Sequence, residues 1–260
     1  MTFLRVYRLQ LTLHNYALKH KMEDAINAIV GATKVALIHM EECVSTQTAA
    51  KEYTHYSADQ IAIFHTWNQV AGYGRTGPWQ STTGNMAATW SFPSHIFSPS
   101  SMYLRTSLAL LKLFDRYGIV STIKWPNDIV VDGEKCAGFL CEQLNSGRVL
   151  IGIGINIATA PQGASRAPTL AKHFDPSTRT IDLVGHLTNE LLAAAAIPDS
   201  LALQLYSRAC ITIGKQYWHS QYGLLTVTGV TESCCLVASV ASGRSTVLAD
   251  VRSLQELVPT

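Results

Sequence analysis

The chain has 260 residues, which is enough for one large domain or for a catalytic domain of about 200 residues with a small appendage. Its 47% hydrophobic and 15% charged residues exclude a mainly disordered protein. Twenty basic and 18 acidic residues give a formal charge of +2, and no run of Lys or Arg marks a nucleic-acid or membrane-binding patch.

Residues 1–34 are predicted to be an N-terminal extension whose role the sequence does not indicate. Within it, residues 5–16 alternate polar and apolar side chains, which is typical of a strand and lacks the apolar core of a signal peptide. No stretch approaches the ~18 uninterrupted apolar residues of a membrane span. The cysteines form no CxxC pair and have no His at metal-ligand spacing, which favours reduced, mostly buried thiols and a cytoplasmic protein; they are Cys43, Cys136, Cys141, Cys210, Cys234 and Cys235.

From Val35 onward the chain alternates predicted strands and helices. Strands are predicted at 35–40, 61–67 and 86–92, with a helix starting near Ser45 between the first two. The polar segment 68–85 holds four glycines and a proline, and a loop this long in a compact domain usually has a function. After Pro99 a helix is predicted, with one apolar face made of Leu104, Leu108, Leu111 and Phe114.

The next segment is predicted to contain a hairpin and a central strand. A strand at 121–125 enters a turn at 126–128, and Asp132-Gly133 is a strong two-residue hairpin signal between 129–131 and 135–142. The strand at 149–157 is almost wholly apolar and therefore central. Helices follow at 181–196 and 199–209. Hairpins outnumber crossovers, so the fold class is α+β, a mixed and mainly antiparallel sheet backed by helices.

Beyond Ile213 the pattern changes to short β runs at 224–230, 234–240 and 245–251. Three such strands so close together predict a small β-barrel. The predicted domains are therefore the extension 1–34, a catalytic domain at 35–209 and a small barrel domain at 210–260.

Four segments carry candidate chemistry, and each has a plain structural alternative. Gly72, Gly74 and Gly77 with Arg75 could bring backbone N–H groups and a guanidinium to a phosphate, or form an ordinary surface loop. The loop is neither a P-loop nor a strand-to-helix GxGxxG. Residues 124–128 (KWPND) could equally be a capped turn.

The other two segments lie on predicted strands. Lys135 with Gly138 starts one strand, and taken alone Lys135 reads as a solvated lysine. Gly152 and Gly154 lie in a buried strand, where glycine weakens a sheet unless something approaches closely. An adenine or ribose face packed there would be such a reason.

The order and spacing of these segments resemble the biotin–protein ligase family, from about Val35 to the C-terminus. The family pattern is a Ser-Thr-Asn-like triplet, a QTxGRGRxGRxW-like loop, KWPND, K-x-x-G-x-L-x-E and GxGIN. This chain has Ser45 to Gln47, then 69–79, 124–128, 135–142 and 152–156. The resemblance implies a class II synthetase-like catalytic domain and a C-terminal SH3-like barrel.

The resemblance also implies the substrates and the site. ATP and biotin would form biotinyl-AMP with Mg²⁺, and the biotinyl group would pass to a lysine of a biotin carboxyl carrier protein. The implied catalytic residues are Lys135, Arg75 and Asp128, with Asp128 beside the metal. The implied biotin contacts are Ser45, Thr46, Gln47, Gln69, Gly72, Tyr73, Gly74, Arg75, Lys135 and Gly138. The implied ATP contacts are Arg75, Trp79, Lys124, Asn127, Asp128, Lys135 and Asn156.

Elementary chemistry agrees with these roles. A carboxylate that attacks an α-phosphate joins two anions, so the site needs fixed cations such as Lys135, Arg75 and a metal. The neutral biotin rings need hydroxyl and amide partners between apolar walls. Three departures stand out: Tyr73 replaces the usual first loop arginine, Gln47 stands where Asn is common, and the segment before Trp79 is one residue short.

Three alternatives compete with this interpretation. A lipoate–protein ligase or octanoyltransferase shares the fold, but its Arg-Arg-x-Ser-Gly-Gly-Gly loop does not occur here. A catalytically dead scaffold conflicts with the presence of both Lys135 and Asp128. A bifunctional ligase-repressor needs a winged helix-turn-helix, for which residues 1–34 are too few. The oligomeric state is not indicated, and a homodimer stays one alternative.

The charge balance leads to a first testable prediction, which is that this chain does not bind DNA specifically. It has no basic face to neutralise several phosphates and no predicted recognition helix. A gel-shift assay with and without biotinyl-AMP should therefore show no specific complex. A sequence-specific shift that weakens with salt would contradict the prediction.

Overall fold

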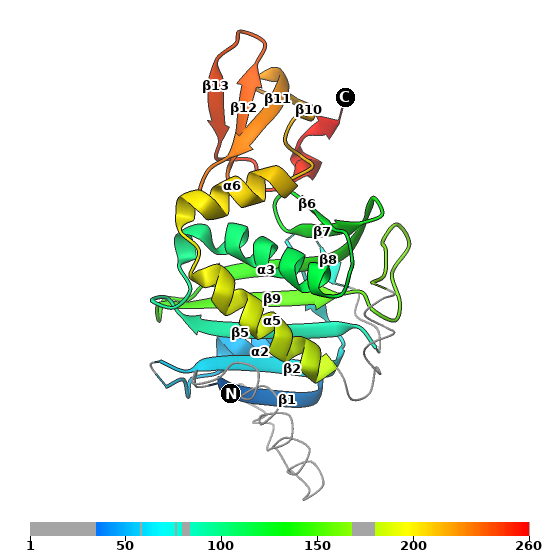
Figure 1. Ribbon diagram of the computed structural model, residues 1–260, viewed down its shortest axis with the longest axis vertical. Coiled ribbons are helices and arrows are strands. Elements are labelled where there is room, and N and C mark those ends of the chain that lie inside the picture. The colour runs from blue at the N-terminus through cyan, green and yellow to red at the C-terminus, as the bar shows by residue number, and fades with distance from the viewer. Residues whose placement is uncertain (1–34, 58, 76, 80–83, 168–179, 260) are drawn as a thin grey trace, which may run out of the picture.

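The computed structural model describes residues 35–57, 59–75, 77–79, 84–167 and 180–259 (Figure 1). The predicted extension 1–34, with its strand at 5–16, lies outside the described residues.

A seven-stranded sheet forms the centre of the main domain (Figure 1). Its first two strands are parallel and every other neighbouring pair is antiparallel, which confirms the predicted mixed, mainly antiparallel sheet. The apolar strand β9 lies fourth of seven, so its predicted central position is also confirmed. In spatial order the strands are β1 (Val35–Cys43), β2 (Ile61–Gln69), β5 (Met86–Pro93), β9 (Arg148–Ile155), β8 (Glu134–Gln143), β7 (Asp128–Val131) and β6 (Thr122–Lys124).

The helices lie at the predicted positions. The two faces of the sheet differ in how many helices cover them. α3 (Met102–Arg116, after the 3-10 turn Pro99–Ser101) and α5 (Thr180–Ala195) lie on one face, and α6 (Asp199–Ala209) links them to the C-terminal region (Figure 1). Among the described helices, only the short α2 (Thr46–Glu52) packs on the other face, across β2, β5 and β9. Ser45 caps α2 as predicted, since its side chain accepts a hydrogen bond from the Thr48 N–H.

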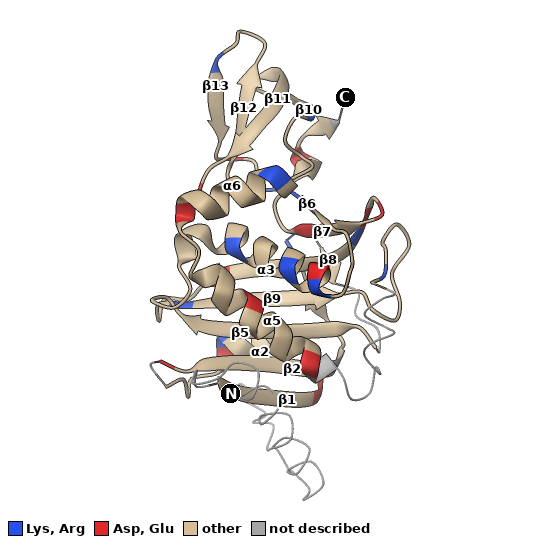
Figure 2. Cartoon of the chain, viewed as in Figure 1, with Lys and Arg blue, Asp and Glu red and all other residues tan. Residues whose placement is uncertain are grey.

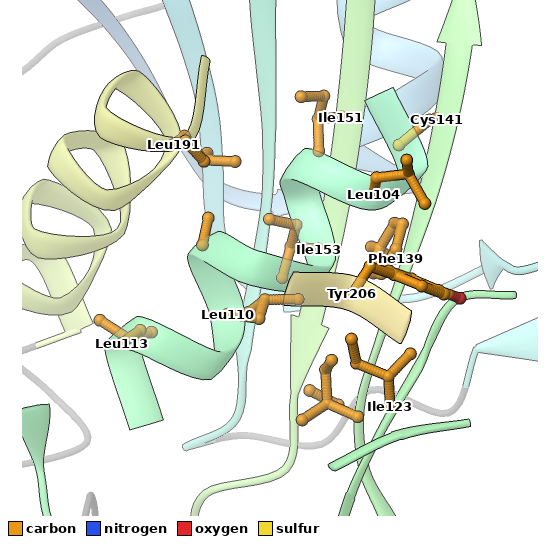
Figure 3. Close-up of a cluster of buried hydrophobic side chains, with 14 of the residues drawn as sticks. Leu104, Leu110, Leu113, Ile123, Phe139, Cys141, Ile151, Ile153, Leu191 and Tyr206 are labelled. Atoms are coloured by element: carbon orange, nitrogen blue, oxygen red, sulfur yellow. The ribbon is translucent and has the colours of Figure 1, made fainter. Parts of the chain in front are cut away.

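Alternation along the strands separates two apolar layers. Ile151 and Ile153 of β9 pack against Leu104, Leu110 and Leu113 of α3 and against Leu191 of α5 (Figure 3). The predicted apolar face of α3 is confirmed, because Leu104, Leu108 and Phe114 are buried and the partly buried Leu111 packs against the core. Leu110 and Leu113, which were not predicted, are also buried. The face of the sheet towards α2 holds a smaller cluster built on Ala50, Ala62, Phe64 and Leu150.

The predicted hairpin turn between β7 and β8 is confirmed. Asp132 and Gly133 have φ values of 52° and 83°, the left-handed pair that a two-residue turn of this kind requires. The turn pairs Val130 with Lys135, and a register shift between Ile129 and Val130 then pairs Asp128 with Gly138. Nζ of Lys135 lies 2.6 Å from Oδ1 of Asp128.

The C-terminal region is a five-stranded antiparallel sheet in the order β13-β12-β11-β10-β14. The three predicted strands are present, while β10 and β14 were not predicted. Closure into an SH3-like barrel stays a prediction. The strands are β10 (Gln216–His219), β11 (Gly223–Val230), β12 (Leu236–Val240), β13 (Ser245–Leu248) and β14 (Val258–Pro259), with a 3-10 turn at Leu254–Glu256.

Hydrogen bonds join this sheet to the main domain through the KWPND segment. The indole Nε1 of Trp125 donates to the carbonyl of Cys234 at 2.7 Å, and the Trp125 N–H donates to the Thr212 hydroxyl at 3.1 Å. The element boundary between Ala209 and Cys210 coincides with the predicted domain boundary, which itself stays a prediction.

The cysteines are free and mostly buried, and the charged residues are mixed over the described elements, as the sequence predicted. All six cysteines are free, and burial raises the pKa of Cys136, Cys141 and Cys234 to about 12. Basic and acidic residues are interspersed over the described elements (Figure 2). Among the described helices, none is long and apolar enough to cross a membrane.

Candidate active site

A pocket of about 240 Å³ opens beside the N-terminus of α2. It lies on the same face of the sheet as α2, over the part of that face that α2 does not cover. Its floor comes from strand positions opposite the α3 layer, and most of them carry small side chains. These floor residues are Ala87 and Thr89 of β5, Gly138 and Leu140 of β8, and Gly152 and Gly154 of β9.

The glycines of β9 make room for side chains of this protein. A Cβ on Gly154 would collide with the indole ring of Trp79, and one on Gly152 would lie 2.5 Å from Oε1 of Gln47. The sequence predicted a close approach at these glycines, and the structure places protein side chains there. Trp79 belongs to a small hairpin of β3 (Gly72–Tyr73) and β4 (Pro78–Trp79).

A second testable prediction follows from this contact. Gly154→Ala should lower the free energy of unfolding by about 1–3 kcal/mol, because the indole ring of Trp79 must shift to admit the methyl group. Denaturant titration measures the change. Gly229→Ala in β11 is the matched control, because a Cβ there has no neighbour within 4 Å. Equal stabilities for the two variants would contradict the prediction.

One end of the pocket is lined by neutral polar side chains, as predicted. Oε1 of Gln69 accepts hydrogen bonds from the Thr46 N–H at 2.9 Å and the Thr46 hydroxyl at 3.2 Å. The hydroxyls of Thr46 and Thr89 are 2.9 Å apart, and Thr89 donates to Oε1 of Gln47 at 3.2 Å. Hydroxyl and amide groups of this kind suit a neutral polar ligand.

Two charged residues adjoin this end, and the sequence did not predict a role for either. Glu142 accepts a hydrogen bond from Nε2 of Gln47 at 2.7 Å, and Lys51 contacts Glu142 at 2.8 Å. Lys51 also donates to the Tyr73 hydroxyl at 3.0 Å. The period-two alternation of β8 could have indicated Glu142, because it faces the same side as Gly138 and Leu140.

The opposite part of the pocket carries the ionic groups. Lys135 Nζ is 2.6 Å from Oδ1 of Asp128 and 5.8 Å from the centre of the Trp79 ring. Lys124 also lines the pocket. The amide of Asn127 is held in place because its Nδ2 donates to the carbonyl of Phe139 at 2.6 Å. An anion bound here would meet lysine ammonium groups.

The guanidinium of Arg75 donates hydrogen bonds to two partners from different parts of the chain. One nitrogen donates to the Tyr103 hydroxyl at 2.7 Å and another to the backbone carbonyl of Arg252 at 2.5 Å. Arg75 therefore ties the glycine-rich loop to α3 and to the C-terminal region. That region lines the pocket through residues 253–255, which no sequence motif indicated.

Thirteen of the fifteen predicted site residues line this one pocket, and Gly72 and Asn156 do not. Gly72 pairs with Trp79, and the Gln69 amide fills the space where its side chain would lie. Asn156 is buried and donates from Nδ2 to the carbonyl of Ser165 at 3.2 Å. Its Oδ1 has no hydrogen-bond partner within the described part of the chain, so the predicted adenine contact stays a prediction.

The lining residues offer limited support for a bound metal ion. Asp128 is the only carboxylate among them, and the described residues contain no cluster of three or more His, Cys, Asp or Glu that could hold a metal. Mg²⁺ commonly uses one or two protein carboxylates together with substrate phosphates. Asp128 therefore fits a metal that arrives with a nucleotide.

Comparison with known proteins finds sequence relatives among the biotin–protein ligases. Residues 41–157 match the Biotin/lipoate A/B protein ligase family. The chain is 36% identical over 115 residues to a biotin--[acetyl-CoA-carboxylase] ligase of Paracoccus denitrificans, covering 38% of this chain and 46% of that protein. It is 34% identical over 138 residues to the bifunctional ligase/repressor BirA of Bacillus subtilis, covering 48% and 41%. The chain thus spans less than half the length of these relatives.

Solved structures share the fold at low sequence identity. The biotin protein ligase from Aquifex aeolicus, in complex with biotin and ATP, matches with a TM-score of 0.62 and 21% identity over 82% of this chain and 94% of that chain. The Leishmania major biotin protein ligase, in complex with biotinyl-5-AMP, matches with a TM-score of 0.59 and 20% identity over 83% and 98%.

Proposed function

We propose that the chain is a biotin–protein ligase, because residues 41–157 match the biotin/lipoate A/B protein ligase family. It activates biotin with ATP and transfers the biotinyl group to a lysine of a carrier protein. The observation that carries the proposal is a single pocket with a neutral polar end at Thr46, Gln47 and Gln69 and an ionic part at Lys135 and Asp128.

The proposed reaction has two steps. A carboxylate oxygen of biotin attacks the α-phosphorus of ATP, the bond to the β-phosphate oxygen breaks, and pyrophosphate leaves. The ε-amine of the acceptor lysine then attacks the carbonyl carbon of biotinyl-AMP, AMP leaves and the amine loses a proton. The first step brings two anions together, which is why Lys135 should contribute most there.

The resemblance to the biotin–protein ligases suggests a role for each group of residues, including Gly72 and Asn156, which lie outside the pocket lining. Ser45, Thr46, Gln47 and Gln69 bind the ureido end of biotin, with Gly72, Tyr73, Gly74 and Gly138 along its length. Lys135 holds the biotin carboxylate and the α-phosphate, and Arg75 secures the loop over them. Trp79, Lys124, Asn127, Asp128 and Asn156 serve the nucleotide.

Mg²⁺ is proposed to bind with ATP. It would neutralise phosphate charge when bound, and Asp128 is the residue here that would hold it. The ion pair with Lys135 keeps the Asp128 carboxylate at the ionic part of the pocket.

The acceptor is proposed to be the biotin carboxyl carrier protein of a carboxylase, in line with the name of the Paracoccus denitrificans relative. Residues 35–209 are proposed as the catalytic domain, and residues 210–260 as an SH3-like barrel that contributes part of the pocket wall. A lipoate ligase or octanoyltransferase is the alternative, because the matched family includes both chemistries. The donor and acceptor groups at the neutral end favour biotin, since a lipoyl or octanoyl chain has no ureido group to pair with them.

The direct test is mass-spectrometric detection of the acyl-adenylate. The protein is incubated with ATP and Mg²⁺ and with biotin, lipoate or octanoate in separate reactions. Biotinyl-AMP should form, and the other two acids should give none. Formation of lipoyl-AMP or octanoyl-AMP without biotinyl-AMP would contradict the proposal and support the alternative.

A further inference from the structure

Glu142 and Lys51 are the charged residues nearest the neutral end of the pocket, and the proposed reaction gives them no role. Glu142 lies on β8, on the same face as the floor residues Gly138 and Leu140. Its two carboxylate oxygens are both occupied, one by Nε2 of Gln47 at 2.7 Å and the other by Nζ of Lys51 at 2.8 Å. The side chains of Lys51 and Glu142 are 35% and 31% exposed, so this ion pair adds little to stability.

The carboxylate determines which way the amide of Gln47 points. An ionised carboxylate only accepts hydrogen bonds, so the amide nitrogen of Gln47 must face Glu142. The amide oxygen then faces the pocket floor, where the Thr89 hydroxyl donates to it at 3.2 Å and Gly152 leaves it room. Gln47 therefore presents an acceptor at this end of the pocket.

Gln69 presents the opposite group. Its amide oxygen is held by the Thr46 N–H and hydroxyl, so its amide nitrogen is left as a donor. That nitrogen lies against Gly72 and has no hydrogen-bond partner among the residues that the structure describes. The two glutamines thus offer one acceptor and one donor. The ureido group of biotin is complementary, with N–H donors beside a carbonyl acceptor.

We propose that Glu142 is a positioning residue that fixes the amide of Gln47 so that its oxygen accepts a hydrogen bond from a ureido N–H of biotin. The inference rests on the proposed function and adds a residue that sets specificity for the ureido group. It also explains the departure at Gln47, because its side chain is one methylene longer than the Asn expected there and spans from α2 to Glu142.

Lys51 completes the arrangement from the same helix. It balances the charge of Glu142 and bonds to Tyr73, which stands where the family pattern has a loop arginine. Burial alone would lower the pKa of Lys51, but the hydrogen bonds to Glu142 and Tyr73 outweigh it and raise the pKa above its ordinary value. Lys51 therefore stays cationic at neutral pH and supplies positive charge next to the loop.

The test is Glu142→Gln, which keeps the size of the side chain and removes its acceptor-only character. The amide of Gln47 can then turn either way, so the dissociation constant of biotin should rise about tenfold, the loss expected for a charge-assisted hydrogen bond. The dissociation constant of ATP and the melting temperature should stay as in the wild type. Glu52→Gln, an exposed position on α2, is the matched control and should change none of the three.

A charge swap separates positioning from simple packing. In the double variant Gln47→Glu with Glu142→Gln, the amide nitrogen at 142 donates to the carboxylate at 47, which still presents an acceptor to the pocket. The swap should bind biotin more tightly than either single variant. Gln47→Glu alone should bind worst, because two carboxylates then face each other.

Each outcome of these titrations has a distinct meaning. Glu142→Gln with wild-type affinity for biotin would overturn the inference and leave the proposed function standing. Equal loss of biotin and ATP binding together with a lower melting temperature would show that Glu142 only supports the fold, and would also overturn it. A wild-type chain with no measurable affinity for biotin would contradict the proposed function itself.

Discussion

Lys135→Ala should slow the formation of biotinyl-AMP roughly a hundredfold or more while the fold stays intact. Lys135 is the cation that meets the carboxylate of Asp128 at 2.6 Å, beside the Trp79 ring. In the proposed reaction it faces the biotin carboxylate and the α-phosphate, whose charges converge in the transition state. A preorganised group of this kind commonly contributes about 2.7–4 kcal/mol.

Biotin-dependent exchange of pyrophosphate into ATP measures this step without the carrier protein. Lys112→Ala on the exposed side of α3 is the matched control and should exchange at the wild-type rate. The side chain of Lys135 is 39% exposed, so its loss should leave the melting temperature nearly unchanged. Near-normal exchange by Lys135→Ala would remove Lys135 from the mechanism.

Arg75→Gly should release biotinyl-AMP about ten times faster while still forming it. The substitution removes two hydrogen bonds, to the Tyr103 hydroxyl and to the carbonyl of Arg252, and makes the loop backbone freer. Two such bonds are together worth roughly 1–3 kcal/mol, which is enough for a tenfold change in the dissociation rate. The released mixed anhydride should then label lysines on bystander proteins.

Dissociation after rapid dilution and streptavidin blotting of a mixed lysate measure the two effects. Tyr103→Phe is the graded control, because it removes one partner of Arg75 and leaves the loop backbone unchanged, so it should leak less than Arg75→Gly. The assignment of Arg75 to loop closure would be wrong if Arg75→Gly abolished adenylation and left the dissociation of supplied biotinyl-AMP unchanged.

Local patterns predicted most elements of the main domain because each pattern has a local cause. The almost wholly apolar run of β9 and the left-handed turn at Asp132 and Gly133 both depend on neighbouring residues alone. The two-residue strands β3 and β4 were missed, since they fall in the segment 68–85 that was predicted to be a loop. The strands β10 and β14 were missed because they have four and two residues, too few for a periodic signal. β14 forms only through pairing with β10, which a single segment cannot reveal.

In the site, too, the residues that belong to local motifs were predicted, and the contacts between distant segments were not. The motifs predicted most of the pocket because Lys135 and Asp128 lie on two strands of one short hairpin, close together in the sequence. Glu142 is the last residue of the K-x-x-G-x-L-x-E motif, but its role and that of Lys51 depend on a contact between β8 and α2 that the motif does not contain. Residues 253–255 reach the pocket through the docking of a separate sheet. Asn156 lies outside the lining, because its backbone bonds to Cys136 and Ala167 and its side chain donates to the carbonyl of Ser165.

The carbonyl of Arg252 that holds Arg75 also bears on the order in which the molecule folds. Residues 45–47 and 253–255 line the same pocket, so it is closed by contacts between very distant parts of the sequence. Such contacts form late, since the chain entropy of the long intervening loop is lost before they become favourable. Refolding molecules are therefore expected to form the main sheet before residues 253–255 complete the wall of the pocket. Recovery of the native far-ultraviolet circular dichroism signal should precede recovery of ligand binding.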